Sequence, residues 1–197
     1  ISLGHGMSST ASRVANAYAA IANGGWLKRP YLVKSVLSSQ GVKTTVSPKT
    51  LRRVISGETS KKLKLMLMNA TADDATGKLA RIPGFPVAGK TGTAQKVNPK
   101  GLGYVPGAYI SSFAGFLPVH DPKFVIYIAV DSPRKNYFGS AVAAPVFAKI
   151  AKFAVRNSGM SPVIIASENL SATRKQAFRG LSPKSKVIRT AKKTPTI

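Results

Sequence analysis

Apolar residues recur with two different periods along the chain, and these periods outline the expected elements. Spacings of four and seven positions, as in Val14, Tyr18 and Ile21, are typical of a helix with one buried face. Such spacing predicts helices over residues 9–22, 63–70 and 140–156. Short apolar runs between turn residues predict strands over residues 31–37, 42–46, 87 to the mid-90s, 111–117 and 124–130. The order helix, hairpin, helix, three strands, helix predicts an α+β fold in which helices flank an antiparallel sheet.

Composition separates a folded part from a tail. Residues 1–162 contain the periodic segments, with glycine- and proline-rich loops expected at 71–86 and 98–107. Residues 163–197 are rich in serine, lysine, arginine and threonine, so we expect a basic, disordered tail. No apolar run approaches the roughly 18 residues of a transmembrane helix. Because the chain begins at Ile1 and shows no signal peptide, we expect a fragment or a processed product of a longer protein.

Charge is the most unusual feature of the composition. The 197 residues include 30 Lys+Arg and 6 Asp+Glu, a formal net charge of +24. Such a chain attracts polyanions, so a polyanion- or nucleic-acid-binding protein is one hypothesis. Nucleic-acid modules interleave aromatic with basic residues, whereas here the aromatics lie in apolar runs at 113–116 and 124–127, so no nucleic-acid partner is expected. With no cysteine and only two histidines, we expect no disulfide, no metal and no cofactor.

The run Lys90-Thr91-Gly92-Thr93 carries the candidate chemistry. Glycine within a predicted strand weakens the sheet and often marks the close approach of a ligand. Lys90 supplies a positive charge, Thr91 and Thr93 supply hydroxyl donors, and Gly92 leaves room. On an edge strand these residues would bind a carboxylate beside an extended peptide, which could add itself as a further strand.

This run and its flanks resemble the penicillin-binding proteins. Lys-Thr-Gly is the third signature of that family and of the class A β-lactamases, beside Ser-x-x-Lys and Ser-x-Asn. The flanking sequences are similar to those of class B penicillin-binding proteins of the cell-division type, over residues 1–162. The resemblance implies the C-terminal half of a transpeptidase domain, with part of the penicillin-binding-protein/β-lactamase-like fold. The matching segments are residues 4–8, 18–25, 82–95, 112–118 and 143–147.

By this resemblance the activity is that of a peptidoglycan D,D-transpeptidase, a serine acyltransferase. A serine attacks the penultimate D-Ala carbonyl of a stem peptide, and β-lactams mimic the D-Ala-D-Ala end and block that serine. Lys90 would act in electrostatics and proton relay, and the backbone N–H of Thr93 would donate to the oxyanion. Thr91, Gly92 and Thr93 would bind the substrate. The family further implies a membrane-anchored protein whose catalytic domain lies in the periplasm or outside the cell, with cell-wall synthesis proteins as partners.

Two of the three signatures are missing upstream of Lys90. Ser132 to Lys135 spells Ser-x-x-Lys, but it follows an apolar strand and has proline after the serine, so we expect a surface turn. Ser167-Glu168-Asn169 spells Ser-x-Asn but lies after Lys90, in the wrong order. We therefore expect the chain to be inactive without the N-terminal remainder of the same protein. A non-catalytic scaffold resembling penicillin-binding proteins is the other alternative, and septal and side-wall roles both stay open.

Overall fold

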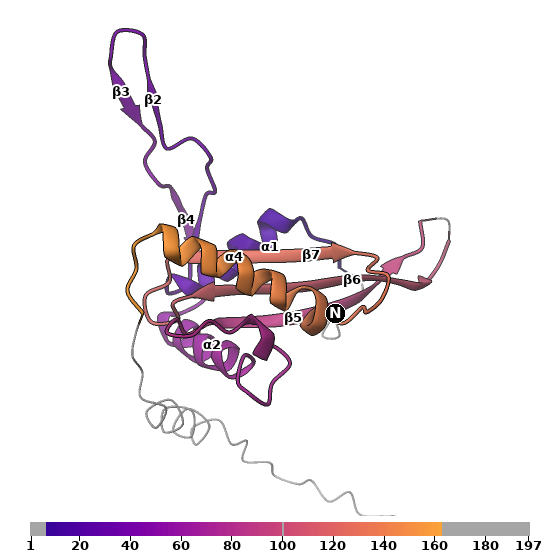
Figure 1. The fold of residues 1–197 in the computed structure, drawn as a ribbon. Coiled ribbons are helices and arrows are strands. Elements are labelled where there is room, and N and C mark those ends of the chain that lie inside the picture. Colours follow the sequence, from indigo (N-terminus) through magenta and orange to yellow (C-terminus); the bar gives the residue numbers. More distant parts are fainter. Residues whose placement is uncertain (1–6, 100, 163–197) are drawn as a thin grey trace, which may run out of the picture. The chain divides into compact units, whose positions relative to one another are not determined.

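The computed structural model describes residues 7–99 and 101–162 (Figure 1). The chain divides into two units, 1–165 and 166–197, and every element described below belongs to the first. The expected tail and the Ser167-Glu168-Asn169 sequence lie outside the described residues. No described helix is long and apolar enough to span a bilayer.

A three-stranded antiparallel sheet forms the centre of the first unit and confirms the predicted α+β class (Figure 1). Its order is β5-β6-β7, so the motif strand β5 lies at one edge. Each strand pairs antiparallel with the next, and the turn between β6 and β7 lies at residues 118–123, as predicted. The bounds are β5 Ala88–Val97, β6 Tyr104–Leu117 and β7 Phe124–Asp131.

Strand β6 is longer than predicted. The loop expected at 98–107 ends early, because Tyr104 already pairs with Val97 across an irregularity in register. Pro106 lies in this extension although proline cannot donate to a strand ladder. It is tolerated because β7 pairs with β6 only from Ile110 onward, which leaves one side of β6 without a described strand at Pro106.

The three predicted helices are confirmed, and each begins at a recognisable residue. Thr10 and Ser56 cap α1 and α2 by accepting the N–H groups of Arg13 and Thr59. The second helix begins earlier than its apolar spacing predicts, because its first turn is polar. A short helix, α3, precedes the last one, which carries proline in its first turn. The bounds are α1 Ala11–Ala22, α2 Gly57–Asn69, α3 Gly139–Val142 and α4 Ala144–Asn157, with a 3-10 turn η1 at Lys78–Ala80.

Helices cover both faces of the sheet. On one face α4 packs through Phe147, whose ring lies 4.7 Å from that of the fully buried Phe113. On the other face α1 brings Tyr18 near Tyr127, and burial, with a smaller contribution from Tyr127, raises the pKa of Tyr18. Side chains alternate between the faces along each strand, so β6 contributes to both layers. The layer under α4 is the main core and comprises Ala80, Ile82, Phe85, Val87, Phe113, Leu117, Ala143, Ala144, Phe147, Ala151 and Val155.

Two small ribbons lie between α1 and α2. Strands β2 (Ser35–Leu37) and β3 (Lys43–Thr45) form the predicted hairpin, but both are shorter than predicted. Strands β1 (Trp26–Lys28) and β4 (Thr50–Arg53) pair at its base and were not predicted. Their short sequences show no clear alternation of apolar and polar residues. The pairing also joins residues more than twenty positions apart, which a local pattern does not reveal. The Arg53 guanidinium lies 5.2 Å from the Trp26 ring centre, a cation–π contact that the sequence pattern does not reveal.

Candidate active site

The motif residues lie on an exposed sheet edge. Residues 90–93 of β5 pair only with β6, and no other described strand lies along their outer side. The unpaired backbone N–H and C=O groups of such an edge can accept an extended peptide as an additional strand. The predicted placement of the motif on an edge strand is therefore confirmed for the described part of the chain.

A cation and two hydroxyls lie next to one another at this edge. The Lys90 Nζ donates to the carbonyl oxygen of Thr91 at 3.1 Å and lies 3.2 Å from its Oγ1. The Thr91 hydroxyl in turn donates to Thr76 Oγ1 at 3.2 Å. Within the described ranges Lys90 pairs with no carboxylate, so its charge is available to an anion. This arrangement can bind a carboxylate through the Lys90 ammonium and the Thr76 hydroxyl, and through the Thr91 hydroxyl once it turns away from Thr76.

Thr76 is a candidate site residue that the sequence reasoning missed. It lies in the segment 71–86, which was predicted only as a loop, and it reaches Thr91 across 15 positions of sequence. Thr71, in the same segment, is buried and donates to the carbonyl oxygen of Val87, just before β5. The loop is thus anchored beside the motif strand by a buried hydrogen bond. The sequence offers as a signal only the two threonines of this stretch.

Thr93 is held from the other side by the start of α3. Its Oγ1 accepts the backbone N–H of Gly139 at 3.1 Å, across 46 positions of sequence. The neighbouring Ser111, paired with Thr93 on β6, donates its hydroxyl to the carbonyl oxygen of Tyr137. The Thr93 hydroxyl therefore has a structural partner, while the backbone of the residue stays in the edge strand.

Aromatic rings gather beside Thr93, and sequence reasoning missed them as well. Tyr137 stacks on Tyr109 with ring centres 4.3 Å apart, and Phe138 lies 4.5 Å from Tyr137. Tyr137 and Phe138 are both substantially exposed. Two adjacent aromatics directly before a glycine and a helix were the available signal. The Ser111–Tyr137 and Thr93–Gly139 hydrogen bonds hold the segment that carries them next to Thr93.

Glycines allow these backbones to approach closely. A Cβ on Gly92 would lie 2.5 Å from Ser112 Oγ, so glycine is favoured there by packing as well as by room for a ligand. A Cβ on Gly139 would lie 2.4 Å from the carbonyl oxygens of both Gly92 and Ser112. Backbone atoms cannot move aside as a flexible side chain can. Gly139 is therefore required for α3 to reach the motif strand.

Replacing Gly139 by alanine should lower the free energy of unfolding by about 1–3 kcal/mol, because the added methyl overpacks two backbones. Urea denaturation followed by circular dichroism measures the change. Gly101→Ala is the matched control, since its Cβ would meet only Asn98 Nδ2, at 3.6 Å. Equal unfolding midpoints for the two variants would show that α3 does not depend on this close approach.

The Ser-x-x-Lys sequence at 132–135 lies at the end of β7, in an irregular segment. Ser132 is exposed, has φ 48° and directs its hydroxyl to Asp131 Oδ1 at 2.7 Å. Lys96 pairs with the same carboxylate at 2.7 Å. Hydrogen bonds from Lys96, and then from Ser132, lower the pKa of Asp131. A serine whose hydroxyl donates to a carboxylate at an exposed strand end lacks the surroundings of an activated nucleophile.

Metal binding finds no support in the described part of the chain. No group of three or more histidine, aspartate or glutamate side chains converges there. The β5 edge itself presents a cation, hydroxyls and backbone N–H groups. These groups bind anions and stabilise developing negative charge.

Comparison with known proteins identifies the family. The family model "Penicillin binding protein transpeptidase domain" matches residues 1–152. Stage V sporulation protein D of Bacillus subtilis is 40% identical over 162 residues, covering 81% of this chain and 25% of that protein. Penicillin-binding protein PbpB of Mycolicibacterium smegmatis is 36% identical over 170 residues, covering 81% and 26%.

Solved structures agree with the sequence matches. Penicillin binding protein 3 of Mycobacterium tuberculosis, complexed with ampicillin, superposes with a TM-score of 0.73 at 32% identity. The match covers 83% of this chain and 38% of that one. The transpeptidase domain of Burkholderia pseudomallei penicillin-binding protein 3 gives a TM-score of 0.66 at 31% identity, covering 83% and 46%.

The chain belongs to the penicillin-binding protein transpeptidase family, as its motif and flanks predicted. Its fold is that of the family's transpeptidase domain, in part. The chain spans about a quarter of the length of the curated relatives named above.

Proposed function

We propose that this chain provides one wall of the active site of a peptidoglycan D,D-transpeptidase. The observation that carries the proposal is the exposed β5 edge, where Lys90, Thr91 and Thr76 present a cation and hydroxyls to an incoming chain. Family membership supports it, because similar proteins bear the name "Probable peptidoglycan D,D-transpeptidase", such as PenA of Neisseria flavescens at 32% identity. We take residues 1–162 as the part of the domain present here and the remainder of the same protein as the source of the other wall.

Substrate binding follows from the edge geometry. A stem peptide ending in D-Ala-D-Ala would lie along β5 as an added strand, with its terminal carboxylate at the Lys90 ammonium and the Thr91 hydroxyl. Gly92, without a side chain, lets the peptide backbone approach the strand. A β-lactam presents a similar carboxylate beside a reactive carbonyl and would occupy the same edge. A similar protein, penicillin binding protein 3 of Mycobacterium tuberculosis, was solved in complex with ampicillin, which supports β-lactam binding by this family member.

The reaction then proceeds by acyl transfer in two steps. A serine outside residues 1–197 attacks the penultimate D-Ala carbonyl, and the backbone N–H of Thr93 donates to the oxyanion that forms. The bond to the last D-Ala breaks, and the leaving amine takes a proton through a relay that includes Lys90. The amine of a neighbouring stem peptide next attacks the ester, which forms the cross-link and returns the serine with its proton.

Location and partners follow from the substrate. Peptidoglycan lies outside the cytoplasmic membrane, so the domain would act in the periplasm or at the cell exterior, with its anchor in a part of the protein outside this chain. Other cell-wall and cell-division synthesis proteins would supply or share the substrate strands.

Fluorescent penicillin tests the proposal on the complete protein and on the isolated chain. The complete protein should be labelled covalently, and a peptide ending in D-Ala-D-Ala should slow the labelling by competing for the β5 edge. The isolated chain should carry no covalent label, because its nucleophile is missing. Stoichiometric labelling of the isolated chain would show that one of its own serines, such as Ser132, is the nucleophile. An unlabelled complete protein would leave the non-catalytic alternative.

A further inference from the structure

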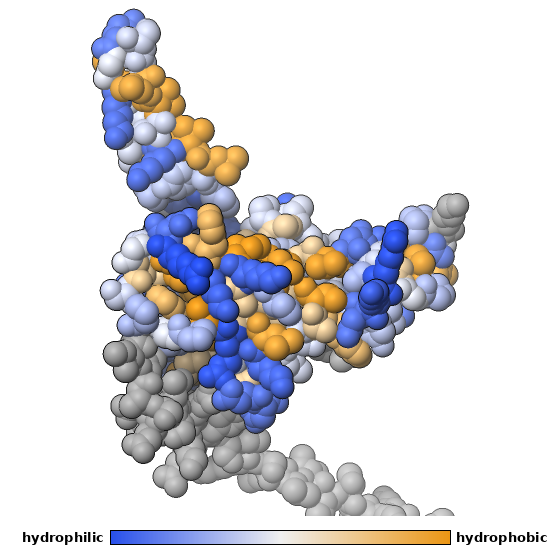
Figure 2. Space-filling model, in the orientation of Figure 1, coloured by the Kyte–Doolittle hydropathy of each residue, from blue (hydrophilic) through white to orange (hydrophobic). Residues whose placement is uncertain are grey.

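The β2–β3 hairpin, residues 29–49, exposes several large apolar side chains to solvent. Leu32 is fully exposed, Val36 is 57% exposed and Val42 is 63% exposed. Figure 2 shows this apolar surface as a continuous orange band along one side of the hairpin. A two-stranded ribbon alone is marginally stable in water, and exposed apolar patches commonly mark interaction sites. The site of acyl transfer proposed above uses none of these residues.

The register places the apolar residues on one face. Val36 pairs with Thr44, and backbone hydrogen bonds join Ser38 to Val42 and Val46 to Lys34. Since side chains alternate along a strand, these residues all share a face. That face therefore presents three valines and the methyl group of a threonine, with a lysine at its base.

Both outer edges of the hairpin are open in the described part of the chain. The hydrogen bonds of Ser38 and Val46 show that the backbone N–H and C=O groups of the even-numbered residues point toward the partner strand of the hairpin. Lys43 and Thr45 of β3 therefore direct their N–H and C=O groups outward. No other described strand pairs with β3. An extended segment can dock there by backbone hydrogen bonds, and its side chains on the valine face would lie beside Val42, Thr44 and Val46, in and next to β3.

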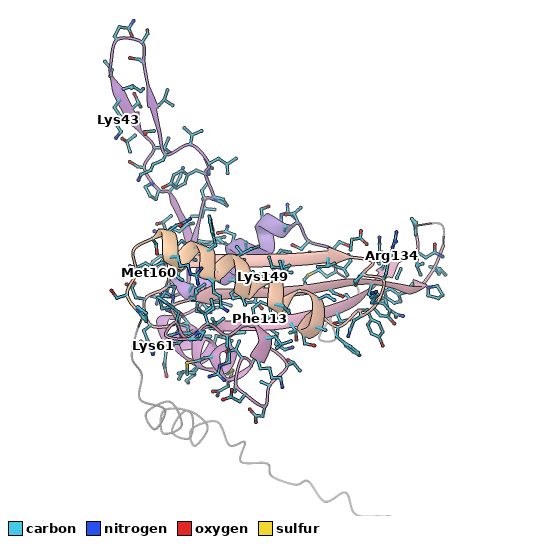
Figure 3. The ribbon with its side chains drawn as sticks, in the orientation of Figure 1. Lys43, Lys61, Phe113, Arg134, Lys149 and Met160 are labelled. Atoms are coloured by element: carbon cyan, nitrogen blue, oxygen red, sulfur yellow. The ribbon has the colours of Figure 1, made fainter. Side chains whose placement is uncertain are left out.

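Charge selects the chemistry of the segment that docks. The hairpin and its base carry only positive charges, and the first acidic residue of the chain is Glu58. Lys43 projects from β3 near the end of the hairpin (Figure 3). No carboxylate of the described residues pairs with the hairpin lysines. An acidic partner would complement these charges, and the attraction would raise its association rate.

Two other occupants are less compatible with the same residues. The turn of the hairpin, Ser38-Ser39-Gln40-Gly41, is polar, whereas a hairpin that inserts into lipid would carry its apolar residues at the turn. A second copy of this chain would bring like charges together, because each copy carries +24. We propose that the hairpin binds an extended segment of a partner protein, in which acidic and β-branched residues alternate, along the outer edge of β3.

A capped peptide of about eight alternating valine and glutamate residues is the probe, since strands of this length are common in sheets. Its affinity for the complete protein is measured by fluorescence anisotropy at low and high salt. The double variant Val42→Glu/Val46→Glu should weaken binding about tenfold or more by removing apolar contacts and repelling the peptide. Thr45→Pro should weaken it similarly, because it removes an outward N–H without removing a bond inside the hairpin.

Leu102→Glu is the matched control, since Leu102 is also fully exposed but lies outside the hairpin. It should bind the peptide as the unchanged protein does, and so should Lys90→Ala, which separates this proposal from the acyl-transfer site. Failure of the peptide to bind would overturn the proposal. So would hairpin-dependent binding to phosphatidylglycerol vesicles in place of the peptide, or hairpin-dependent self-association in sedimentation velocity.

Discussion

Replacing Lys90 by alanine in the complete protein is expected to slow acylation by penicillin about a hundredfold or more. This is the typical effect of losing one preorganised charge or donor at a developing anion. The Lys90 ammonium lies at the exposed edge beside Thr91 and has no carboxylate partner among the described residues. Its loss removes the charge that would bind the substrate carboxylate. The rate of adduct formation, followed by gel fluorescence, measures the effect.

Lys96→Ala is the matched control for this variant. Lys96 lies on the same strand, but its ammonium is paired with Asp131 at 2.7 Å. We expect Lys96→Ala to leave the acylation rate within about twofold, because exposed ion pairs contribute little to the fold. Similar losses in both variants would mean that the net charge of β5, rather than the position of Lys90, drives acylation.

Replacing Phe147 by alanine is expected to lower the free energy of unfolding by about 3–5 kcal/mol, the usual cost of truncating a buried phenylalanine. Phe147 is completely buried and packs against Phe113, which pairs with Thr91 in the sheet register. The cavity would therefore form directly beneath the motif strand. Urea denaturation measures the stability, and the acylation rate at low denaturant reports on the motif.

Phe153 provides the control on the same helix. It is 68% exposed, so Phe153→Ala removes a ring of the same size without opening a core cavity. Its stability should stay within about 0.5 kcal/mol of the unchanged protein, as for most surface substitutions. If Phe153→Ala destabilised the protein as strongly as Phe147→Ala, the orientation of α4 on the sheet would be wrong.

The sheet and its helices could be predicted because their signals are local. Apolar spacing placed α1 within two residues and the end of α4 within one, whereas the predicted start at residue 140 falls in α3; short apolar runs placed β5 and β7. The start of α2 was missed because its first turn is polar and capped by Ser56. Strand β6 was predicted too short, because Pro106 and Gly107 are typical of a loop. Pro106 is accommodated in the strand because β7 does not pair with β6 at that position.

The candidate site could be predicted only along its own strand. Residues 90–93 are contiguous, so their residue types and the edge placement follow from sequence. The residues that surround them come from distant segments: Thr76 from a predicted loop and Gly139 from the start of α3. Their contacts depend on tertiary packing, which no local pattern encodes. The aromatic rings of Tyr109 and Tyr137 meet for the same reason.

The most direct test of the account is intact-mass analysis of the native protein from its source cells, before and after penicillin, followed by peptide mapping. We expect a single acyl adduct on a serine outside residues 1–197, which would unite that nucleophile with the Lys90 edge described here. An adduct on Ser132 or any other serine of this chain, or no adduct at all, would contradict the proposed division of the active site.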